Sequence, residues 1–540
     1  MSGAPSTSTA MVVDEHAGRV DVAVVGAGPA GLAAATEAAR AGLSVALFDE
    51  QPEPGGQIYR AIEAVSANDP RLLALLGEDY ARGRDLVAAF RASGAQWHAR
   101  HSVFDLSADG GLAVLGPDGA RWWQARRVIV ATGAMERPVA VPGWTLPGVM
   151  GVGAAQTLLK QSALVPDEPT VLAGSGPLLF LAASQLLAAG ASVAAILETT
   201  PAGNLQRAAP HLIRAFMAGP EIRKGIAWRR ALMRAGVPFH GRVDDLRIDG
   251  DEHRKTVTAH SRGRPIEIAC SLVLLHEGVV PSTQLPMIAG VDHHYDDLQA
   301  SWHARVDAAG RTNQAAILVA GDCAGIGGAE LAAARGRLAG LAAAADLGAM
   351  DAAQAHRRGG DAHELLARKA PLRRFLDTLY RPRQQVLVPP DDDTIVCRCE
   401  EVRAGELRKM AALGCTGPNQ AKAFSRCGMG PCQGRQCSLT AAQILAHESG
   451  RSVAAAGHFR VRPPVKPVTV GELAAMVGLG APPETGPLLP TGPGESGPAK
   501  AGAAETLTAV AGTAESDTPD RDTPGTGPAK AGPSDRDARS

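Results

Sequence analysis

Cysteines in this 540-residue chain are concentrated in one segment: six of the eight lie between positions 397 and 437. Cys397 and Cys399 form the pair CRC, and three more thiols lie in CGMGPCQGRQC, from Cys427 to Cys437. Thiols at this density, in a chain without a recognisable secretion signal, favour metal or redox chemistry over structural disulfides. Because four thiolates can hold a [2Fe–2S] cluster, the segment predicts an iron–sulfur site.

Zinc is the main alternative, since four thiolates also suit a tetrahedral zinc ion. Structural zinc sites mostly use C-x-x-C pairs, and the C-x-C and C-x4-C spacings here fit that pattern poorly. Free thiols are the third possibility. The remaining cysteines, Cys270, Cys323 and Cys415, have no partner at ligand spacing and are expected to be small buried residues.

A second group of residues that could do chemistry lies in DVAVVGAGPAGLAAATEAARAGLSVALFDE, near the N-terminus. Gly26, Gly28 and Gly31 occupy the G-x-G-x-x-G positions between a β-branched strand and an Ala-rich helix. They permit a tight turn, close approach to a pyrophosphate and close packing of the helix on the sheet. Asp49 and Glu50 end the next strand, where a carboxylate can accept hydrogen bonds from a ribose. The segment predicts a dinucleotide site; an ordinary turn with chance glycines is the alternative.

Three further motifs indicate which dinucleotide binds. Their residues are Gly55, Gly56 and Gln57, the ATG triplet ending in Thr132 and Gly133, and the pair Gly321 and Asp322. Together these motifs resemble the glutathione-reductase and thioredoxin-reductase class of flavoproteins, over residues 20–345. The resemblance implies FAD, with Asp322 hydrogen-bonded to its ribityl chain. No C-x-x-C pair precedes Cys397, so disulfide reduction is not expected.

A second glycine turn lies in VLAGSGPLLFLAASQ, where Gly174 and Gly176 fill the first two positions but Leu179 replaces the third glycine. Without that glycine the helix packs less closely and the pyrophosphate seat is altered. Three interpretations stay open: an NAD(P) that exchanges electrons, a resident nucleotide that does not react, and an empty structural domain. If a nucleotide binds, Glu198 favours one without a 2′-phosphate.

The elements expected to position these motifs are parallel strands with crossover helices, because β-branched runs alternate with Ala-rich stretches up to residue 347. We predict an α/β fold with two Rossmann-type dinucleotide domains, a small helical cysteine domain and a disordered tail. The predicted parts are a loose tail (1–19), a discontinuous FAD domain (20–155 and 291–347), an NAD(P)-like domain (156–290), a helical connector (348–390), a [2Fe–2S] domain (391–450), a strap (451–481) and a Gly-, Pro- and Ala-rich tail (482–540).

Within the cysteine domain, the C-x-C residues alternate along an extended segment, which predicts both sulfurs on one side. The 32 residues between Cys399 and Cys432 suffice for two short helices. This arrangement resembles bacterioferritin-associated ferredoxin. The resemblance implies Cys397, Cys399, Cys432 and Cys437 as ligands, with Cys427, at a gap of only 27 residues, as a neighbour.

Composition limits the partners. Lys and Arg (54) balance Asp and Glu (55), so net charge gives no reason to expect nucleic acid or an anionic membrane surface. No run of 18 strongly apolar residues occurs, so no membrane span is predicted, and a cytoplasmic location is expected. No catalytic acid or base is assigned. His276 and Glu277 are candidates near the flavin, although a loop of the nucleotide domain is the favoured interpretation.

Longer segments, among them HEGVVPSTQL and RVRPPVKPVTVGELA, resemble the α subunits of opine oxidases, of L-proline and hydroxyproline dehydrogenase complexes and of hydrogen cyanide synthase, over about 20–480. The resemblance implies a hetero-oligomer in which this chain relays electrons from a β-type FAD-dependent amine oxidase subunit to a quinone or another carrier. A small ferredoxin-like subunit is a further expected partner. The alternatives are a self-sufficient NAD(P)H-dependent flavin/iron–sulfur reductase and a non-enzymatic scaffold.

Overall fold

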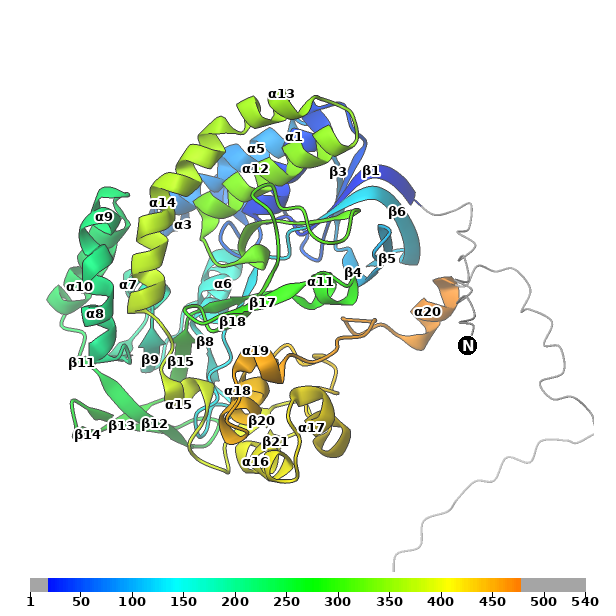
Figure 1. Cartoon of the computed structure of the whole chain (residues 1–540). Coiled ribbons are helices and arrows are strands. Elements are labelled where there is room, and N and C mark those ends of the chain that lie inside the picture. The colour runs from blue at the N-terminus through cyan, green and yellow to red at the C-terminus, as the bar shows by residue number, and fades with distance from the viewer. Residues whose placement is uncertain (1–17, 477–540) are drawn as a thin grey trace, which may run out of the picture. The chain divides into compact units, whose positions relative to one another are not determined.

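The computed structural model describes residues 18–476, in which two largely parallel sheets have helices packed against them (Figure 1). In the first sheet, strands β3, β2, β1, β6 and β19 run parallel, and β5 and β4 extend it in antiparallel fashion beyond β6. The strands are β1 (Gly18–Val25), β2 (Val45–Asp49), β3 (Gln96–Ala99), β4 (Ser102–Leu106), β5 (Gly111–Gly116), β6 (Gly119–Val130) and β19 (Ile317–Val319). Because β19 follows the second sheet in sequence, the first domain is discontinuous.

Helix α1 (Pro29–Arg40) connects β1 to β2 and packs against α12 (Ala329–Asp346) (Figure 1). A side chain at Gly336 or Gly340 would overlap the backbone of α1, so these glycines let the two helices approach closely. Shorter helices complete this layer: α2 (Ile62–Asn68), α3 (Pro70–Leu76), α4 (Glu78–Ala81) and α5 (Gly83–Arg91). The close packing fixes where the glycine turn before α1 lies.

The second sheet has the order β11-β10-β9-β15-β8 and is parallel throughout. It comprises β8 (Val149–Gly151), β9 (Thr170–Ser175), β10 (Val193–Glu198), β11 (Phe239–Gly241) and β15 (Leu272–Glu277), with α6 (Val152–Ser162) and α7 (Pro177–Ala188) against it. An antiparallel sheet, β12 (Val243–Gly250), β13 (Lys255–Ser261) and β14 (Arg264–Cys270), and helices α8 (Ala202–Ala208), η1 (Ala209–His211), α9 (Leu212–Met217) and α10 (Glu221–Arg234) complete the domain. The prediction of an α/β fold with two Rossmann-type domains is confirmed.

Two small antiparallel strand pairs lie outside the two parallel sheets. They are β7 (Ala134–Glu136) with β16 (Val279–Pro281) and β17 (His293–Asp296) with β18 (Ser301–Ala304), accompanied by α11 (Gln284–Ile288) and η2 (Gly321–Ala324). The first pair joins β7, which directly follows the ATG triplet, to β16, which directly follows the last strand of the second sheet.

The C-terminal part begins with α13 (Ala352–Arg358), α14 (Gly360–Leu379) and α15 (Gln384–Leu387). The cysteine segment contains β20 (Ile395–Cys397), β21 (Val402–Arg403), α16 (Ala404–Ala412), α17 (Pro418–Ser425) and α18 (Ser438–Glu448), followed by α19 (Val453–Ala456) and α20 (Val470–Met476). Helices α16 and α17 are the two short helices expected between Cys399 and Cys432. Val396, Leu407 and Ile444 are buried in the core of this part.

Contacts between residues far apart in sequence attach the cysteine segment to the rest of the protein. The indole Nε1 of Trp144 donates a 2.7 Å hydrogen bond to the carbonyl oxygen of Ile395. Gln443 of α18 donates a hydrogen bond to the hydroxyl of Tyr295. Since Ile395 lies two residues before Cys397, the first contact holds the start of the thiol site against the dinucleotide domains.

The segment after α18 contacts the first sheet. The backbone N–H of Val465 donates to the carbonyl of Phe104 in β4 at 2.9 Å, and Lys466 pairs with Glu50 at 2.7 Å. This part of the predicted strap is therefore tied to the first domain. The two predicted tails lie outside the described residues, except that Gly18 and Arg19 begin β1. Across residues 18–476, every helix is too short or too polar to span a bilayer.

Candidate functional site

The first glycine turn requires glycine at two positions for steric reasons. Gly26 has a φ of 102°, and a Cβ there would lie 2.5 Å from the carbonyl oxygen of Ala131. A Cβ at Gly31 would overlap the carbonyl oxygen of Gly26. The third glycine thus brings α1 onto the turn, as the motif predicts.

The GGQ segment lies over this turn. A Cβ at Gly56 would come within 2.6 Å of the Cα of Gly28, and the N–H of Gly55 donates to the carbonyl of Ala27 at 2.8 Å. Gln57, the last residue of the motif, is exposed. The two glycine segments form a cradle of bare backbone, which suits a pyrophosphate.

The two acids at the end of β2 lie in different surroundings. Asp49 accepts hydrogen bonds from the N–H groups of Ala27, at 2.6 Å, and Gln51, at 2.8 Å. Burial raises the pKa of Asp49, and these two donors oppose the shift. Glu50 instead accepts from the hydroxyl of Ser102 and pairs with the strap. Of the two predicted residues, Asp49 is therefore the one beside the glycine turn.

The ATG triplet contacts the end of the second domain. Thr132 Oγ1 donates to the carbonyl of Ser282 at 3.1 Å, and the N–H of Ser282 donates to the carbonyl of Gly133 at 3.0 Å. The Cys323 thiol donates to the same Ser282 carbonyl at 3.0 Å. Burial raises the pKa of Cys323 to about 12, so the residue is an uncharged buried thiol.

Asp322 has a fixed orientation at the start of η2. Its Oδ1 accepts from the N–H groups of Gly327, at 2.8 Å, and Gly328, at 3.1 Å. Gly321 has a φ of 75°, and a Cβ there would lie 2.6 Å from the Cβ of Ala30 in α1. The predicted pair is thus held against the helix that follows the glycine turn.

The second glycine turn differs from the first. Gly176 has a φ of 120°, and Leu179 is fully buried where the third glycine would stand. A Cβ at Gly176 would lie 3.3 Å from Nε2 of His276, so this imidazole lies beneath the turn. Glu198 ends β10 as expected, and burial raises its pKa.

His276 and Glu277 are the last residues of β15, so they belong to the nucleotide domain but lie in a strand and not in the loop that the favoured interpretation expects. His276 Nδ1 lies 2.7 Å from a carboxylate oxygen of Glu136, and Glu277 accepts from the hydroxyl of Thr199 at 2.8 Å. Both side chains are buried, and Glu277 also lies 3.5 Å from Nε of Arg383, which precedes α15.

Three cysteine sulfurs converge at the buried side of the thiol site. Those of Cys397, Cys427 and Cys437 all lie within 4.8 Å of one another. The thiols of Cys427 and Cys437 donate to the Cys397 sulfur, which lowers the pKa of Cys397 to about 2. Sequence spacing treated Cys427 as a neighbour of the ligands, whereas the structure includes it in the buried trio.

The other two predicted ligands, Cys399 and Cys432, lie on the outer side and contact each other. The prediction that Cys397 and Cys399 lie along one extended strand is wrong, because β20 ends at Cys397 and Cys399 lies in the following turn. Gly430 packs directly on Cys399, where a Cβ would overlap the cysteine side chain. Among the described residues, only Cys397, Cys427 and Cys437 have sulfurs that all lie within 4.8 Å of one another, and the charge of Cys397 acts on Cys399 from nearby.

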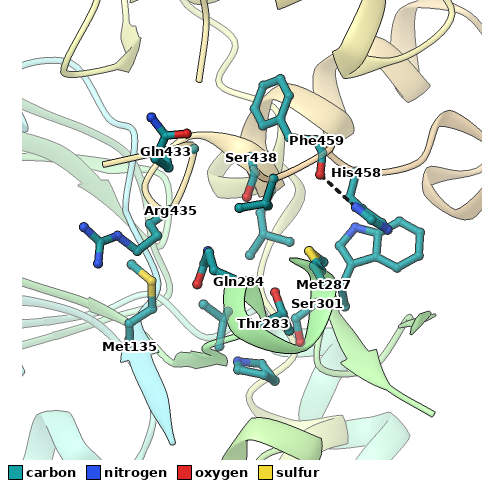
Figure 2. A pocket seen from close by; sticks show the side chains of 16 residues that line it. Met135, Thr283, Gln284, Met287, Ser301, Gln433, Arg435, Ser438, His458 and Phe459 are labelled. Atoms are coloured by element: carbon teal, nitrogen blue, oxygen red, sulfur yellow. Dashed lines mark hydrogen bonds between the residues drawn. The ribbon is translucent and has the colours of Figure 1, made fainter. Parts of the chain in front are cut away.

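A small pocket of about 30 Å³ lies where the dinucleotide domains meet the thiol loop (Figure 2). Met135 and Thr283 line it from one side, and Arg435 and Ser438 from the other (Figure 2). Thr283 follows Ser282, the residue bonded to the ATG triplet, and Arg435 lies between Cys432 and Cys437. The pocket is therefore lined by segments next to the two predicted sites, and its lining contains neither a cysteine nor a residue of the dinucleotide motifs.

Comparison with known families gives two matches, one over the two parallel sheets and one over the cysteine segment. Residues 20–356 match the family described as pyridine nucleotide-disulphide oxidoreductase, and residues 393–477 match the sarcosine oxidase A3 domain. The second match spans the cysteine segment together with most of the strap.

Whole-length relatives narrow the family further. The opine oxidase A-type subunit of Agrobacterium tumefaciens (strain Ach5) is 43% identical over 468 residues, which is 84% of this chain and 91% of the relative. The chain belongs to the family of opine oxidase A-type subunits. The predicted family is thereby confirmed, and with it the prediction of an FAD-dependent oxidoreductase at the level of the family.

More distant relatives of this chain match nearly as much of its length. Hydrogen cyanide synthase subunit HcnB of Pseudomonas aeruginosa (strain PAO1) is 33% identical, over 82% of this chain and 96% of the relative. Among solved structures, L-proline dehydrogenase from P. horikoshii aligns with a TM-score of 0.60 at 20% identity, over 85% of this chain and 81% of that chain. At that identity the likeness shows a shared fold.

Proposed function

We propose that this chain is the FAD- and [2Fe–2S]-containing electron-transfer subunit of a multi-subunit amine or imino-acid dehydrogenase of the opine, proline or hydroxyproline class. It relays electrons from a β-type flavoprotein partner, which oxidises the substrate, to a quinone or another carrier. The observation that carries the proposal is that Thr283, which follows the Ser282 bonded to the ATG triplet, and Arg435, which lies between Cys432 and Cys437, line the same pocket (Figure 2). The names of the relatives, which are subunits, support a hetero-oligomer.

The dinucleotide turn fits FAD because its backbone is bare where a pyrophosphate must approach. The residues proposed to hold the cofactor are Gly26, Gly28, Gly31, Asp49, Gly56, Gln57, Thr132, Gly133, Gly321 and Asp322. Asp49 has lone pairs left for a ribose after accepting from Ala27 and Gln51, and Asp322 has one oxygen not committed to Gly327 and Gly328. Glu50, the other acid predicted here, faces the strap and takes no part in the proposal.

The thiol site fits an iron–sulfur cluster by the chemistry of its donors. Cys397, Cys399, Cys432 and Cys437 are the proposed ligands, since four thiolates can hold a [2Fe–2S] cluster. When bound, FAD exchanges one or two electrons and a [2Fe–2S] cluster exchanges one, so the pair can convert two-electron oxidation into single-electron transfer. Cys427 supports the cluster as a thiol donor beside Cys397.

The second glycine turn is proposed to be structural. Leu179 occupies the third position, and the His276 imidazole lies under Gly176, paired with Glu136. Both features oppose close approach of a nicotinamide dinucleotide. This favours the relay over the self-sufficient NAD(P)H-dependent reductase.

The experiment combines analysis and titration of protein purified without oxygen. We expect stoichiometric FAD, two irons and two acid-labile sulfides per chain, and no bleaching of the flavin by NADH. Iron-free protein with full flavin, or zinc in place of iron, would contradict the cluster. Rapid bleaching by NADH would instead establish the reductase.

A further inference from the structure

A lysine lies buried where the second domain meets the first glycine turn. Lys160 of α6 is 3% exposed, and its Nζ donates hydrogen bonds to the carbonyl oxygens of Gln57, at 3.2 Å, and Ile58, at 3.0 Å. Gln57 directly follows Gly56, whose backbone lies against Gly28 in the turn. The ammonium therefore holds the segment that covers the turn.

The lysine is itself fixed by buried side chains of the second domain. Its Nζ donates to Oε1 of Gln156, one turn earlier in α6, at 3.1 Å. Gln156 Nε2 donates to Oε1 of Gln185 in α7 at 2.7 Å, and Gln185 Nε2 donates to the carbonyl oxygen of Leu76 in α3 at 3.2 Å. A chain of buried polar groups thus ties the GGQ segment to α6 and α7, and the three donors of the ammonium all have acceptors.

This cation has no counter-ion, because every acceptor that residues 18–476 offer to its Nζ is neutral. The titratable groups around it are Arg60 and Tyr80, whose ring centroid lies 5.9 Å from Nζ, while α6 and α7 contribute the neutral amides of Gln156 and Gln185. Burial, together with the charge of Arg60, lowers the pKa of Lys160 to about 7. Since a buried charge without an opposite charge is costly, a bound anion would stabilise this cation.

We propose that Lys160 is a positioning residue of the dinucleotide site, a buried ammonium that holds the GGQ segment in place and attracts the pyrophosphate of the bound cofactor. The proposal rests on the FAD site proposed above and adds a residue from the second domain, outside all the glycine motifs. It also gives α6 and α7 a part in binding FAD, although the second glycine turn is proposed to be structural.

The proposal couples FAD binding to a proton. The pyrophosphate is negative and favours the charged ammonium, so FAD raises the pKa of Lys160, and the protein takes up a proton from water on binding. Only the protonated form binds tightly, and the free protein loses this form as the pH rises above about 7. If FAD raises the pKa from about 7 to about 8, the Kd should rise about sixfold between pH 6.5 and 8.5.

The experiment uses the full chain freed of flavin. Quenching of FAD fluorescence gives the Kd at pH 6.5 and 8.5, and calorimetry in HEPES and in Tris at pH 7.5 counts the protons. We expect the sixfold rise in Kd and uptake of about half a proton per FAD. The same Kd at both pH values, or FAD binding without proton uptake, would overturn the proposal. A wild type that binds no FAD at either pH would instead refute the proposed function.

Lys160→Met removes the ammonium and keeps an unbranched side chain. It should bind FAD at least eightfold more weakly than the wild type at pH 6.5, with the same Kd at both pH values and no proton uptake. A variant that keeps the wild-type pH dependence would show that another group titrates, and the proposal would be wrong. If the variant does not fold, the proton count of the wild type decides.

The matched control is Lys255→Met. Lys255 of β13 is 1% exposed, and its Nζ also donates to carbonyl oxygens, those of Glu252 at 3.2 Å and Ser271 at 2.9 Å. The control therefore removes an equally buried ammonium of the second domain that does not contact the GGQ segment. It should lower stability in urea unfolding but keep the wild-type Kd for FAD and its pH dependence. Equal losses of pH dependence in both variants would reduce Lys160 to a general structural role and overturn the proposal.

Discussion

Gly28 and Gly31 stand three residues apart in the first glycine turn, yet a methyl group added at each would meet different surroundings. At Gly28 the nearest atom would be the Cα of Gly56, 3.9 Å away, and the backbone is extended, with a φ of −74°. At Gly31 the methyl would lie well inside 3.0 Å of the carbonyl oxygen of Gly26. The two alanine variants therefore separate the cofactor's space from the protein's own packing.

Gly28→Ala should leave the fold intact, because 3.9 Å is ordinary van der Waals contact. Its methyl occupies the space through which a pyrophosphate would approach the backbone, so we expect the Kd for FAD to rise at least tenfold, a loss of about 1.4 kcal/mol. Gly31→Ala gains about 1 kcal/mol of helix propensity but must push α1 off the turn. Since overpacking costs about 1 to 3 kcal/mol or more, we expect a net loss of about 2 kcal/mol in the free energy of unfolding.

The assay uses flavin-free protein of both variants and of the wild type. Urea unfolding gives the free energy of unfolding, and quenching of FAD fluorescence gives the Kd. Wild-type affinity in Gly28→Ala would refute the cradle between Gly28 and Gly56 as the pyrophosphate seat. Full stability of apo Gly31→Ala would refute the steric argument for the turn.

Three further predictions concern the thiol site and the core. Cys399→Ser should lose the iron, whereas Cys427→Ser should retain most of it with a shifted EPR spectrum; the reverse pattern, measured by metal analysis, would move Cys427 into the ligand set. Burial lowers the pKa of His303 to about 4, below its value in the unfolded chain, so the unfolded state binds the extra proton between about pH 6.5 and 4. Stability is therefore lost as pH falls through that window, by at most about 1.4 kcal/mol per pH unit, and His303→Asn should flatten the slope in urea unfolding. Trp144→Phe removes one hydrogen bond to β20, so it should cost about 1 kcal/mol and speed hydrogen exchange there, whereas unchanged exchange would show that the contact carries no stability.

The fold was predictable because its signals are local. Gly26 and Gly31 mark a turn that only glycine can form, and the β-branched runs around them mark parallel strands. The helices between Cys399 and Cys432 follow likewise from the length of the gap and its turn residues.

Features that depend on tertiary packing were harder to predict. Spacing left Asp49 and Glu50 equivalent, and only the Ala27 N–H and the distant strap separate them. The position of Cys427 depends on how the loop from Cys427 to Cys437 folds back on β20. A gap length of 27 residues carries no information about that folding, although the presence of a fifth thiol in the segment was itself a signal.

The bond between Trp144 and Ile395 has a consequence for engineering and for evolution. The Trp144 indole lies 251 residues before its acceptor in the sequence and anchors β20, the first strand of the cysteine segment. Tyr295 makes a second contact with that segment, because its hydroxyl accepts a hydrogen bond from Gln443. A foreign ferredoxin grafted after residue 390 would leave both side chains without their partners. The dinucleotide domains and the cysteine segment of such a chain are thus expected to be inherited together, and a transplant would have to import the matching surface along with the cysteines.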